Sequence, residues 1–394
     1  MRINIDKFLF SLFFYGIIFL PGLLMILNEN LGSNYYGVIV VSAFVIFFKM
    51  VFCSNDLFLP KKGLSIIALI LLALTFHLFI AVSLFPLEKE ESIFKILFSL
   101  FSIAIILIAC FFTTVSMNKL TDNAFLKITN NIFFILLGVG VLSSVMVVLG
   151  LQNNKKMFFF TEPSHYALVA STFYAYKISI KKTNVIYGLM LLAIALSVQN
   201  LSLIIGVALA IIINFLRLRT LLLIPVIIVP IYTIAINMIS DERLEYYSQR
   251  LDISENSNNT STLTLLSGYE QAYLALKDTY GFGYGLQRMG YPNDRGLFVD
   301  TIGMLRGGNK ESNLHDGGLF VSKLTVEFGI FGLVFFLYVM MLGIKGTKKL
   351  NVKLNFFSIT LIMSSMYFLL RGSGYFTPSA ILIFWSIVAL KRYK

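Results

Sequence analysis

Charged residues are scarce in this chain. Only 13% of its 394 residues are Asp, Glu, Lys or Arg, whereas soluble domains contain about 25%. Hydrophobic residues make up 57% of the chain, and the mean hydropathy is +0.82. This composition excludes an ordinary water-soluble enzyme, and the abundance of apolar residues excludes a disordered chain.

Residues that form disulfides or bind metals are also few. The chain has two cysteines, Cys53 and Cys110, which lie inside or at the edge of apolar blocks, and three histidines. Its sequence contains no HExxH motif, no cysteine pair and no cluster of aspartates. We therefore expect neither a disulfide framework nor a metal site, and no cofactor.

The apolar residues form long blocks, most of them near the roughly 20 residues that span a bilayer core. We predict twelve transmembrane helices, at residues 8–27, 35–53, 64–85, 93–117, 126–150, 164–178, 184–199, 200–216, 220–239, 318–343, 352–370 and 375–391. Residues 184–216 can form one long helix or two short ones, and the polar pair Gln199 and Asn200 favours a break. The first block contains Pro21 and no small-residue cleavage site, so we expect that it is not a cleaved signal peptide. The predicted fold class is an all-α polytopic membrane protein.

Lysines and arginines are concentrated in alternate connections between these blocks. With the N-terminus placed in the cytoplasm, seven short segments on that side contain 19 of the 32 basic residues. Lys155 and Lys156 are the clear exceptions on the outer side. The positive-inside rule therefore predicts that both termini are cytoplasmic. The same distribution explains most of the net charge of +12, so we expect no nucleic-acid partner.

One polar segment of 78 residues, 240–317, separates nine predicted helices in 1–239 from three in 318–394. The predicted orientation places this segment outside the membrane. Within it, apolar residues at helical spacing predict an amphipathic helix at about 261–278, which Gly281 ends. A connection of this length in a compact protein is usually a functional loop or lid.

A carboxylate and a histidine lie together at the predicted outer end of the block 164–178. Glu162 precedes Pro163, which suits the first turn of a helix, so Glu162 can simply favour the helix dipole. The alternative is a functional pair, in which Glu162 and His165 act at the outer mouth of a cavity. His77 lies within the third block, and we interpret it as structural.

A second group of ionisable residues begins where the polar segment meets the block 318–343. His315 would lie beside a helix N-terminus, where neutral imidazole is favoured and backbone N–H groups can bind an anion. Lys323 and Glu327 are four residues apart on one helical face, and Glu327 lies roughly 13 Å below residue 318. An ionisable residue at that depth is usually functional, and a structural ion pair is the alternative.

Arginines and glycines on the outer side are candidates for binding phosphate. Guanidinium groups can form two hydrogen bonds with phosphate oxygens, and the candidates are Arg243, Arg250, Arg288, Arg295, Arg306 and Arg371. The run Gly-Phe-Gly-Tyr-Gly at 281–285 would let backbone N–H groups approach a diphosphate, or it is a flexible turn. The polar segment also contains seven tyrosines, whose rings can pack against sugars or lie in the membrane interface.

Together these features resemble the Wzy-type O-antigen polymerases, which belong to a superfamily that also contains the O-antigen ligases. The chain shares the twelve predicted helices and the large outer loop before the last three of them. Glu-Pro-Ser at 162–164 resembles a polymerase motif that follows the fifth helix, and 281–285 resembles the Gly-x-Gly loop motif of the family. Residues 315–319, continuing to Glu327 and Gly329, resemble its His-x-x-x-Leu…Glu-x-Gly pattern.

The resemblance implies a GT-C-like membrane glycosyltransferase of lipopolysaccharide biosynthesis in the inner membrane of a bacterium. At the periplasmic face it would join oligosaccharide repeat units that are linked to undecaprenyl diphosphate. An acceptor hydroxyl would attack the anomeric carbon of the donor, and the lipid diphosphate would leave. The implied partners are the lipid-linked donor and acceptor, membrane lipid and a separate chain-length regulator protein.

For this reaction, position and residue chemistry lead us to assign roles to single residues. His315 is the first candidate for the catalytic base, and Glu162 is its rival. The substrate and its diphosphate are assigned to Arg250, Arg288, Arg295, Arg306, Arg371, Gly283, Gly285, His165, Lys323 and Glu327. Many relatives have an arginine where this chain has Ser-Gly-Tyr-Glu at 267–270, and Arg250 is the candidate substitute.

Two alternatives remain open. An O-antigen ligase would use the same fold and donor but would transfer the glycan to lipid A core, and the Glu-Pro-Ser motif favours the polymerase. A transporter or flippase without chemistry also suits twelve helices. Such transporters are often built from two repeated halves, and this sequence shows no internal repeat.

Overall fold

The computed structural model describes residues 4–27, 34–52, 61–86, 93–153, 157–160, 162–215, 259–290, 292, 295–307, 318–346, 351–372 and 374–392. Of these residues 84% are helical, and none of them forms a β-strand. The all-α class is therefore confirmed for the part of the chain that the structure describes.

Most of the helices follow the predicted blocks, whereas α13 and the 3₁₀ helix η3 were not predicted. Their bounds are α1 Ile5–Leu27, α2 Asn34–Phe52, α3 Lys61–Leu84, α4 Ile93–Asn118, α5 Asp122–Val148, α6 Pro163–Ile180, the 3₁₀ helix η3 Lys182–Ile186, α7 Tyr187–Ser197, α8 Leu201–Phe215, α12 Thr260–Asp278, α13 Leu297–Leu305, α14 Phe320–Gly346, α15 Val352–Phe368 and α16 Pro378–Arg392. The predicted amphipathic helix is α12. The block 220–239 lies outside the described residues.

The predicted break between α7 and α8 is confirmed. Gln199 has a positive φ of 52°, which ends α7. The side chain of Asn200 then accepts a hydrogen bond from Leu203 N at 3.2 Å and donates one to Pro163 O at 2.7 Å. Because both contacts satisfy polar groups at the break, two short helices replace one long helix.

Six helices are long and apolar enough to cross a membrane, as a polytopic membrane protein requires. They are Ile5–Leu27, Tyr35–Phe52, Ser65–Leu84, Phe94–Asn118, Asp122–Val148 and Phe320–Gly346. Four further apolar helices, Lys182–Ser197, Leu201–Phe215, Val352–Phe368 and Pro378–Lys391, are shorter. These findings rest on length and composition within the described residues.

Helices α6 and α15 form the centre of the bundle. Of the 18 residues of α6, 13 are buried, and 14 of the 17 residues of α15 are buried. Many of these are small or carry a hydroxyl, and several serine and threonine hydroxyls donate within the helix, as Ser171 does to Ala167 O at 2.6 Å. Small side chains let neighbouring helices pack closely around α6 and α15.

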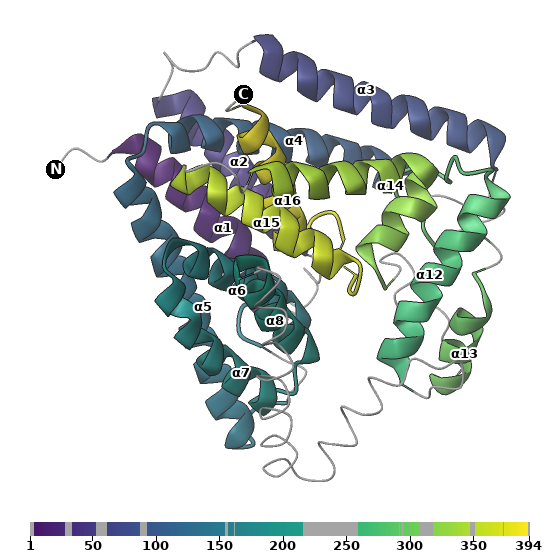
Figure 1. The fold of residues 1–394 in the computed structure, drawn as a ribbon. Coiled ribbons are helices and arrows are strands. Elements are labelled where there is room, and N and C mark those ends of the chain that lie inside the picture. The colour runs from purple at the N-terminus through teal and green to yellow at the C-terminus, as the bar shows by residue number, and fades with distance from the viewer. Residues whose placement is uncertain are drawn as a thin grey trace.

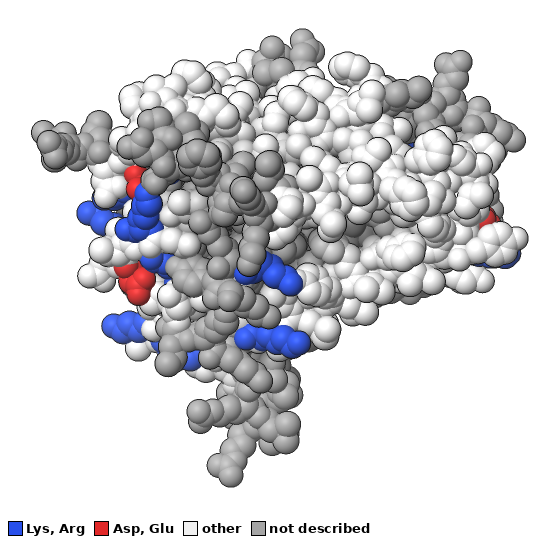
Figure 2. All heavy atoms as spheres, turned by 90° about the horizontal axis from the view of Figure 1, so that it is seen from above, with Lys and Arg blue, Asp and Glu red and all other residues white. Residues whose placement is uncertain are grey.

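The two ends of the bundle differ in chemistry. In Figure 1, α12 and α13 lie at one end, where α12 lies beside the first half of α14 and its C-terminal end approaches the end of α3, and the chain termini lie toward the other end. Figure 2 shows that the described lysines and arginines of one face gather at the end of the N-terminus. There Asp6 forms ion pairs with Lys49 and Lys119, each at 3.6 Å.

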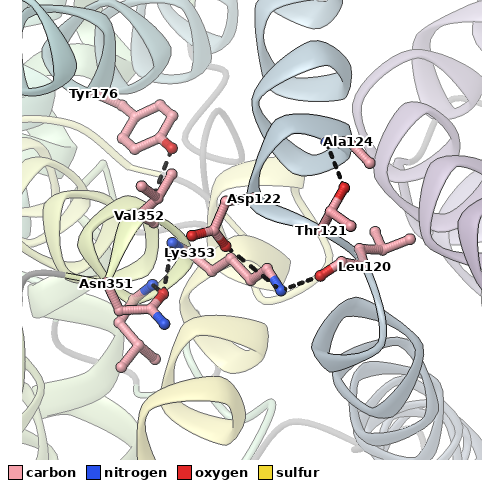
Figure 3. Close-up of polar contacts among 9 residues, drawn as sticks. Leu120, Thr121, Asp122, Ala124, Tyr176, Asn351, Val352 and Lys353 are labelled. Carbon is pink, nitrogen blue, oxygen red and sulfur yellow. Dashed lines mark hydrogen bonds and ion pairs between the residues drawn. The ribbon is translucent and has the colours of Figure 1, made fainter.

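A second polar network lies at the basic end. The ammonium of Lys353 lies 3.8 Å from Asp122 and donates to Leu120 O, so it joins α15 to the link between α4 and α5 (Figure 3). Asn351 caps α15, and Tyr176 of α6 donates to Val352 O at 3.2 Å. The basic end is therefore held together by structural ion pairs and caps.

The arrangement makes the predicted orientation testable. In a variant whose native cysteines are replaced, Tyr273→Cys on exposed α12 should react with a membrane-impermeant maleimide in spheroplasts. Asn118→Cys at the basic end should react only after the membrane is opened, because the positive-inside rule places that end in the cytoplasm. The reverse pattern would invert the orientation.

Candidate functional site

Helix α14 is broken at Gly329, whose φ of 57° and ψ of −136° are not helical. The loop 281–285 packs directly against this break. Tyr284 N donates to Val326 O at 2.9 Å, Gly285 N donates to Glu327 O at 2.7 Å, and Ile330 N donates to Gly281 O at 2.8 Å. The loop thus supplies hydrogen-bond partners that the broken helix lacks, as backbone groups inside an apolar bundle require.

Glycine is required in this loop because the two backbones touch. A Cβ atom on Gly283 would lie 2.4 Å from Gly329 N, and one on Gly329 would lie 2.0 Å from Gly281 O. Both glycines also have positive φ angles. The Gly-x-Gly pattern therefore has a packing role in this structure.

The N–H groups of the loop are all engaged inside the protein. In chain order, the five N–H groups of 281–285 donate to Leu276 O, Thr279 O, Thr279 Oγ1, Val326 O and Glu327 O, at 2.7–2.9 Å. The first of these closes the C-terminal end of α12, with Tyr280 in the left-handed conformation at φ 51°. A diphosphate role for Gly283 and Gly285 stays a prediction that would require these bonds to break.

Glu162 and Arg371 form an ion pair although they lie 209 residues apart in the chain. The guanidinium of Arg371 lies 3.1 Å from Glu162 Oε2, and the Ser164 hydroxyl donates to the same oxygen at 3.0 Å. The side chains of Glu162 and Arg371 are 53% and 34% exposed, so solvent reaches both. Among the candidate residues these two provide an accessible base and an accessible cation in direct contact.

Local sequence fixes Glu162 at this position. Pro163 starts α6 with no N–H to satisfy, and Glu162 is the extended residue before it, without a capping bond from its side chain. Its carboxylate is therefore free to meet Arg371, which follows the end of α15. The capping interpretation of Glu162 is not supported by its hydrogen bonds.

The electrostatics of Glu162 follow from these neighbours. Burial raises the pKa of its carboxyl, but the charges of His165 and Arg371 and the bonds from Ser164 and Arg371 together hold it below the ordinary value of 4.5. Glu162 is therefore ionised at neutral pH.

A buried cluster lies on α14 before its break at Gly329. Lys323 and Glu327 form the predicted ion pair, with 3.4 Å between Lys323 Nζ and Glu327 Oε1, and their side chains are 3% and 0% exposed. Tyr375, from the link between α15 and α16, donates its hydroxyl to Glu327 Oε2 at 2.7 Å. The ammonium of Lys323 also lies 5.1 Å from the centre of the Tyr375 ring. The cluster is covered by protein, so the structural alternative fits it better than direct contact with a substrate.

The loop arginines contact different parts of the protein. Arg288 is fully buried and donates to Tyr284 O at 2.6 Å and Phe85 O at 3.0 Å, so it joins the loop to the end of α3. Arg295 and Arg306 lie before and after α13, the first partly exposed and the second exposed. Their binding of a diphosphate stays a prediction, and Arg288 would first have to leave its carbonyl partners.

Of the remaining candidates, His77 lies among the described residues and three others do not. His315, Arg243 and Arg250 lie outside the described residues. His77 packs its ring parallel to Phe282, with 4.5 Å between ring centres, and contacts Phe282 O through Nε2 at 3.0 Å. This contact between α3 and the loop fits the structural interpretation of His77. Within the described ranges, no group of His, Cys, Asp and Glu is arranged to hold a metal ion.

The sequence did not predict the contacts of three side chains that organise this end of the molecule. Glu270 accepts from Leu297 N at 2.8 Å and Phe298 N at 3.0 Å, and so caps α13. Tyr269, one of the seven tyrosines proposed to contact sugars, donates to Leu369 O at 2.6 Å. Tyr375, in contact with Glu327, lies in a short connection between two apolar blocks, where the sequence offers no periodic signal for its role.

Comparisons with known proteins identify no relative of this chain. No protein-family model, no curated protein and no solved structure matches the chain. Functional inference therefore rests on the residues themselves.

The Glu162–Arg371 pair predicts a specific dependence of stability on pH. Because the folded pKa of Glu162 is depressed, its charge stabilises the protein above the unfolded pKa, and this contribution is lost as the pH falls through the folded value. Both side chains are partly exposed, so we expect no more than about 1 kcal/mol. Melting temperatures of the wild type and Glu162→Gln in detergent should differ at neutral pH and converge below about pH 4. A difference that is constant across pH would contradict the pair.

The packing role of the glycine loop is tested by two alanine substitutions. Gly283→Ala places a Cβ against α14, whereas Gly307 also has a positive φ, of 65°, but has open space around it. We expect Gly307→Ala to cost about 1–2 kcal/mol of conformational strain, and Gly283→Ala to cost several kcal/mol more. Thermal unfolding in detergent measures both, and equal shifts would show that the loop does not touch α14 in solution.

Proposed function

We propose that this chain is a membrane glycosyltransferase that acts on lipid-diphosphate-linked oligosaccharides, in the manner of an O-antigen polymerase. The single observation that carries the proposal is the Glu162–Arg371 pair, an accessible carboxylate and guanidinium in contact at the end of the bundle opposite the basic residues. A glycosyl transfer from a lipid diphosphate needs both groups, a base for the acceptor hydroxyl and a cation for the leaving diphosphate.

In the proposed reaction, a hydroxyl of the acceptor repeat unit attacks the anomeric carbon of the donor. A new glycosidic C–O bond forms, the bond to the diphosphate oxygen breaks, and the hydroxyl proton passes to Glu162. The diphosphate carries the electron pair away, and Arg371 stabilises its charge through two hydrogen bonds.

Because of the ion pair, the diphosphate would bind Arg371 before Glu162 accepts the hydroxyl proton. While Arg371 contacts Glu162, the pKa of the carboxyl is depressed and Glu162 is a weak base. A bound diphosphate competes for the guanidinium and releases Glu162. The pKa of the released carboxyl then rises, because the charge and hydrogen bond of Arg371 no longer offset burial, although those of His165 and Ser164 still do. Glu162 therefore becomes a better base when substrate is present.

The proposal includes the finer features of fold and location. It assigns the chain twelve spans with a GT-C-like arrangement, in a bacterial inner membrane, with α12 and α13 periplasmic and both termini cytoplasmic. Its substrates are donor and acceptor glycans on undecaprenyl diphosphate, and a separate chain-length regulator is an expected partner. His315 and Arg250 remain candidates beside Glu162 and Arg371.

Reconstitution tests the proposal directly. In liposomes that contain undecaprenyl-diphosphate-linked repeat units, the wild type should form polymer. Glu162→Gln should reduce turnover by about 10²–10⁴, the usual scale for a lost base, and Arg371→Lys should retain part of the activity that Arg371→Gln loses. Lys119→Gln, which removes a cation from an ion pair at the opposite end, is the matched control and should stay active.

Undiminished polymer formation by both Glu162→Gln and Arg371→Gln would remove this pair from the mechanism. Replacing the acceptor by lipid A core separates a ligase from a polymerase. Transport of the lipid-linked unit without any polymer would instead support a flippase.

A further inference from the structure

Arg371 lies on the short connection between α15 and α16. Besides the contact of Arg371 with Glu162, three hydrogen bonds join the described residues of this connection to α12 and α14. Before Arg371, the hydroxyl of Tyr269 on α12 donates to Leu369 O at 2.6 Å. At Arg371 itself, Phe320 N donates to the backbone oxygen at 3.4 Å. After Arg371, Tyr375 donates to Glu327 at 2.7 Å. One contact comes from α12 and two come from the part of α14 that precedes Gly329.

The contact of Tyr375 is the strongest of the three. Tyr375 is 4% exposed, and its ring packs edge-on against Phe320, with 5.6 Å between ring centres. Glu327 is fully buried, and its Oε1 atom accepts no hydrogen bond. Among the described residues, the Tyr375 hydroxyl is thus the hydrogen-bond donor to this carboxylate, with Lys323 as its ion-pair partner. A hydrogen bond to a buried charge is stronger than one between neutral groups.

Backbone packing restricts the same connection. A Cβ atom on Gly372 would lie 2.7 Å from Gly318 C and O, so residue 372 lies directly against the start of the α14 segment. Arg371 therefore has little freedom to move away from α14 while these contacts persist. Its side chain then extends to Glu162 at the start of α6.

We infer that Tyr375 and Tyr269 are positioning residues that hold Arg371 against Glu162, and that the buried Lys323–Glu327 pair serves to fix Tyr375. The inference rests on the proposed function for its catalytic consequence. It assigns a supporting role to Lys323 and Glu327, which were candidates for substrate binding. It also assigns Tyr269 a contact with the protein backbone, through a hydroxyl that was a candidate for sugar contact.

The position of Arg371 can be measured without any enzymatic assay. Phenylglyoxal modifies exposed arginines, and mass spectrometry of the peptide that contains Arg371 reports its rate of modification in the full chain. Removing the Tyr375 hydroxyl in Tyr375→Phe keeps the ring but deletes the bond to Glu327. We expect Arg371 to be modified roughly tenfold faster, the scale of one lost hydrogen bond to a charged group. Tyr269→Phe should act in the same direction through a different contact.

A buried tyrosine at the opposite end provides the matched control. Tyr176 is 1% exposed and donates to Val352 O, so Tyr176→Phe also removes one hydroxyl from a packed site (Figure 3). In Tyr176→Phe, Arg371 should be modified at the same rate as in the wild type. Unchanged modification of Arg371 in both Tyr375→Phe and Tyr269→Phe would overturn the positioning role.

Two further measurements, enzymatic turnover and protection of Arg371 from phenylglyoxal by a diphosphate, distinguish failure of this inference from failure of the proposed function. If both hold, undecaprenyl diphosphate should protect Arg371 of the wild type from phenylglyoxal, and Tyr375→Phe should lower kcat about tenfold or more with little change in KM. That split is expected because a displaced Arg371 loses its contact with the leaving group in the transition state. Faster modification without protection and without loss of turnover would support the positioning of Arg371 and overturn its proposed catalytic role.

Discussion

A break in a helix inside an apolar bundle exposes backbone groups that water cannot satisfy, and this constraint organises the end of the protein that contains α12 and α13. In α14 the break at Gly329 is satisfied by the loop 281–285, which exchanges three backbone hydrogen bonds with the helix. The loop follows α12 directly, so the same bonds attach the α12–α13 segment to the bundle. The half of α14 before Gly329 thereby becomes a fixed base for the groups around it.

Those groups form a continuous path from the buried cluster to the solvent. The Lys323–Glu327 pair on α14 holds Tyr375, and the connection that contains Tyr375 also contains Arg371. Arg371 meets Glu162, where both side chains reach solvent. The basic end differs in kind, because there lysines pair with Asp6 and Asp122 and with backbone oxygens in caps and ion pairs. The Glu162–Arg371 pair and the buried Lys323–Glu327 pair are therefore connected through the short segment between α15 and α16.

Several elements were predictable because their signals are local. Apolar length predicted most of the helices that the structure describes, helical spacing predicted α12, and Asn200 marked the break between α7 and α8, whereas the short helices η3 and α13 were not predicted. The spacing of Lys323 and Glu327 predicted their ion pair. The break at Gly329 was not predicted, because glycine in an apolar run is also tolerated within a continuous helix. The motif 281–285 was recognised in the sequence. Its backbone hydrogen bonds to α14 were not predicted, because a contact between distant segments produces no local sequence pattern.

By itself, then, the sequence determined a helical chain with membrane-length apolar segments and placed its polar candidates near the helix ends. Only the tertiary structure decided which candidates meet. It joined Glu162 to Arg371 across 209 residues, buried Arg288 among carbonyl oxygens, and gave Tyr375 a carboxylate partner. The physical reason is that hydrophobicity and helix formation depend on neighbours in the chain. A polar group in an apolar interior takes whichever partner packing brings within reach, and that partner is set by the whole fold.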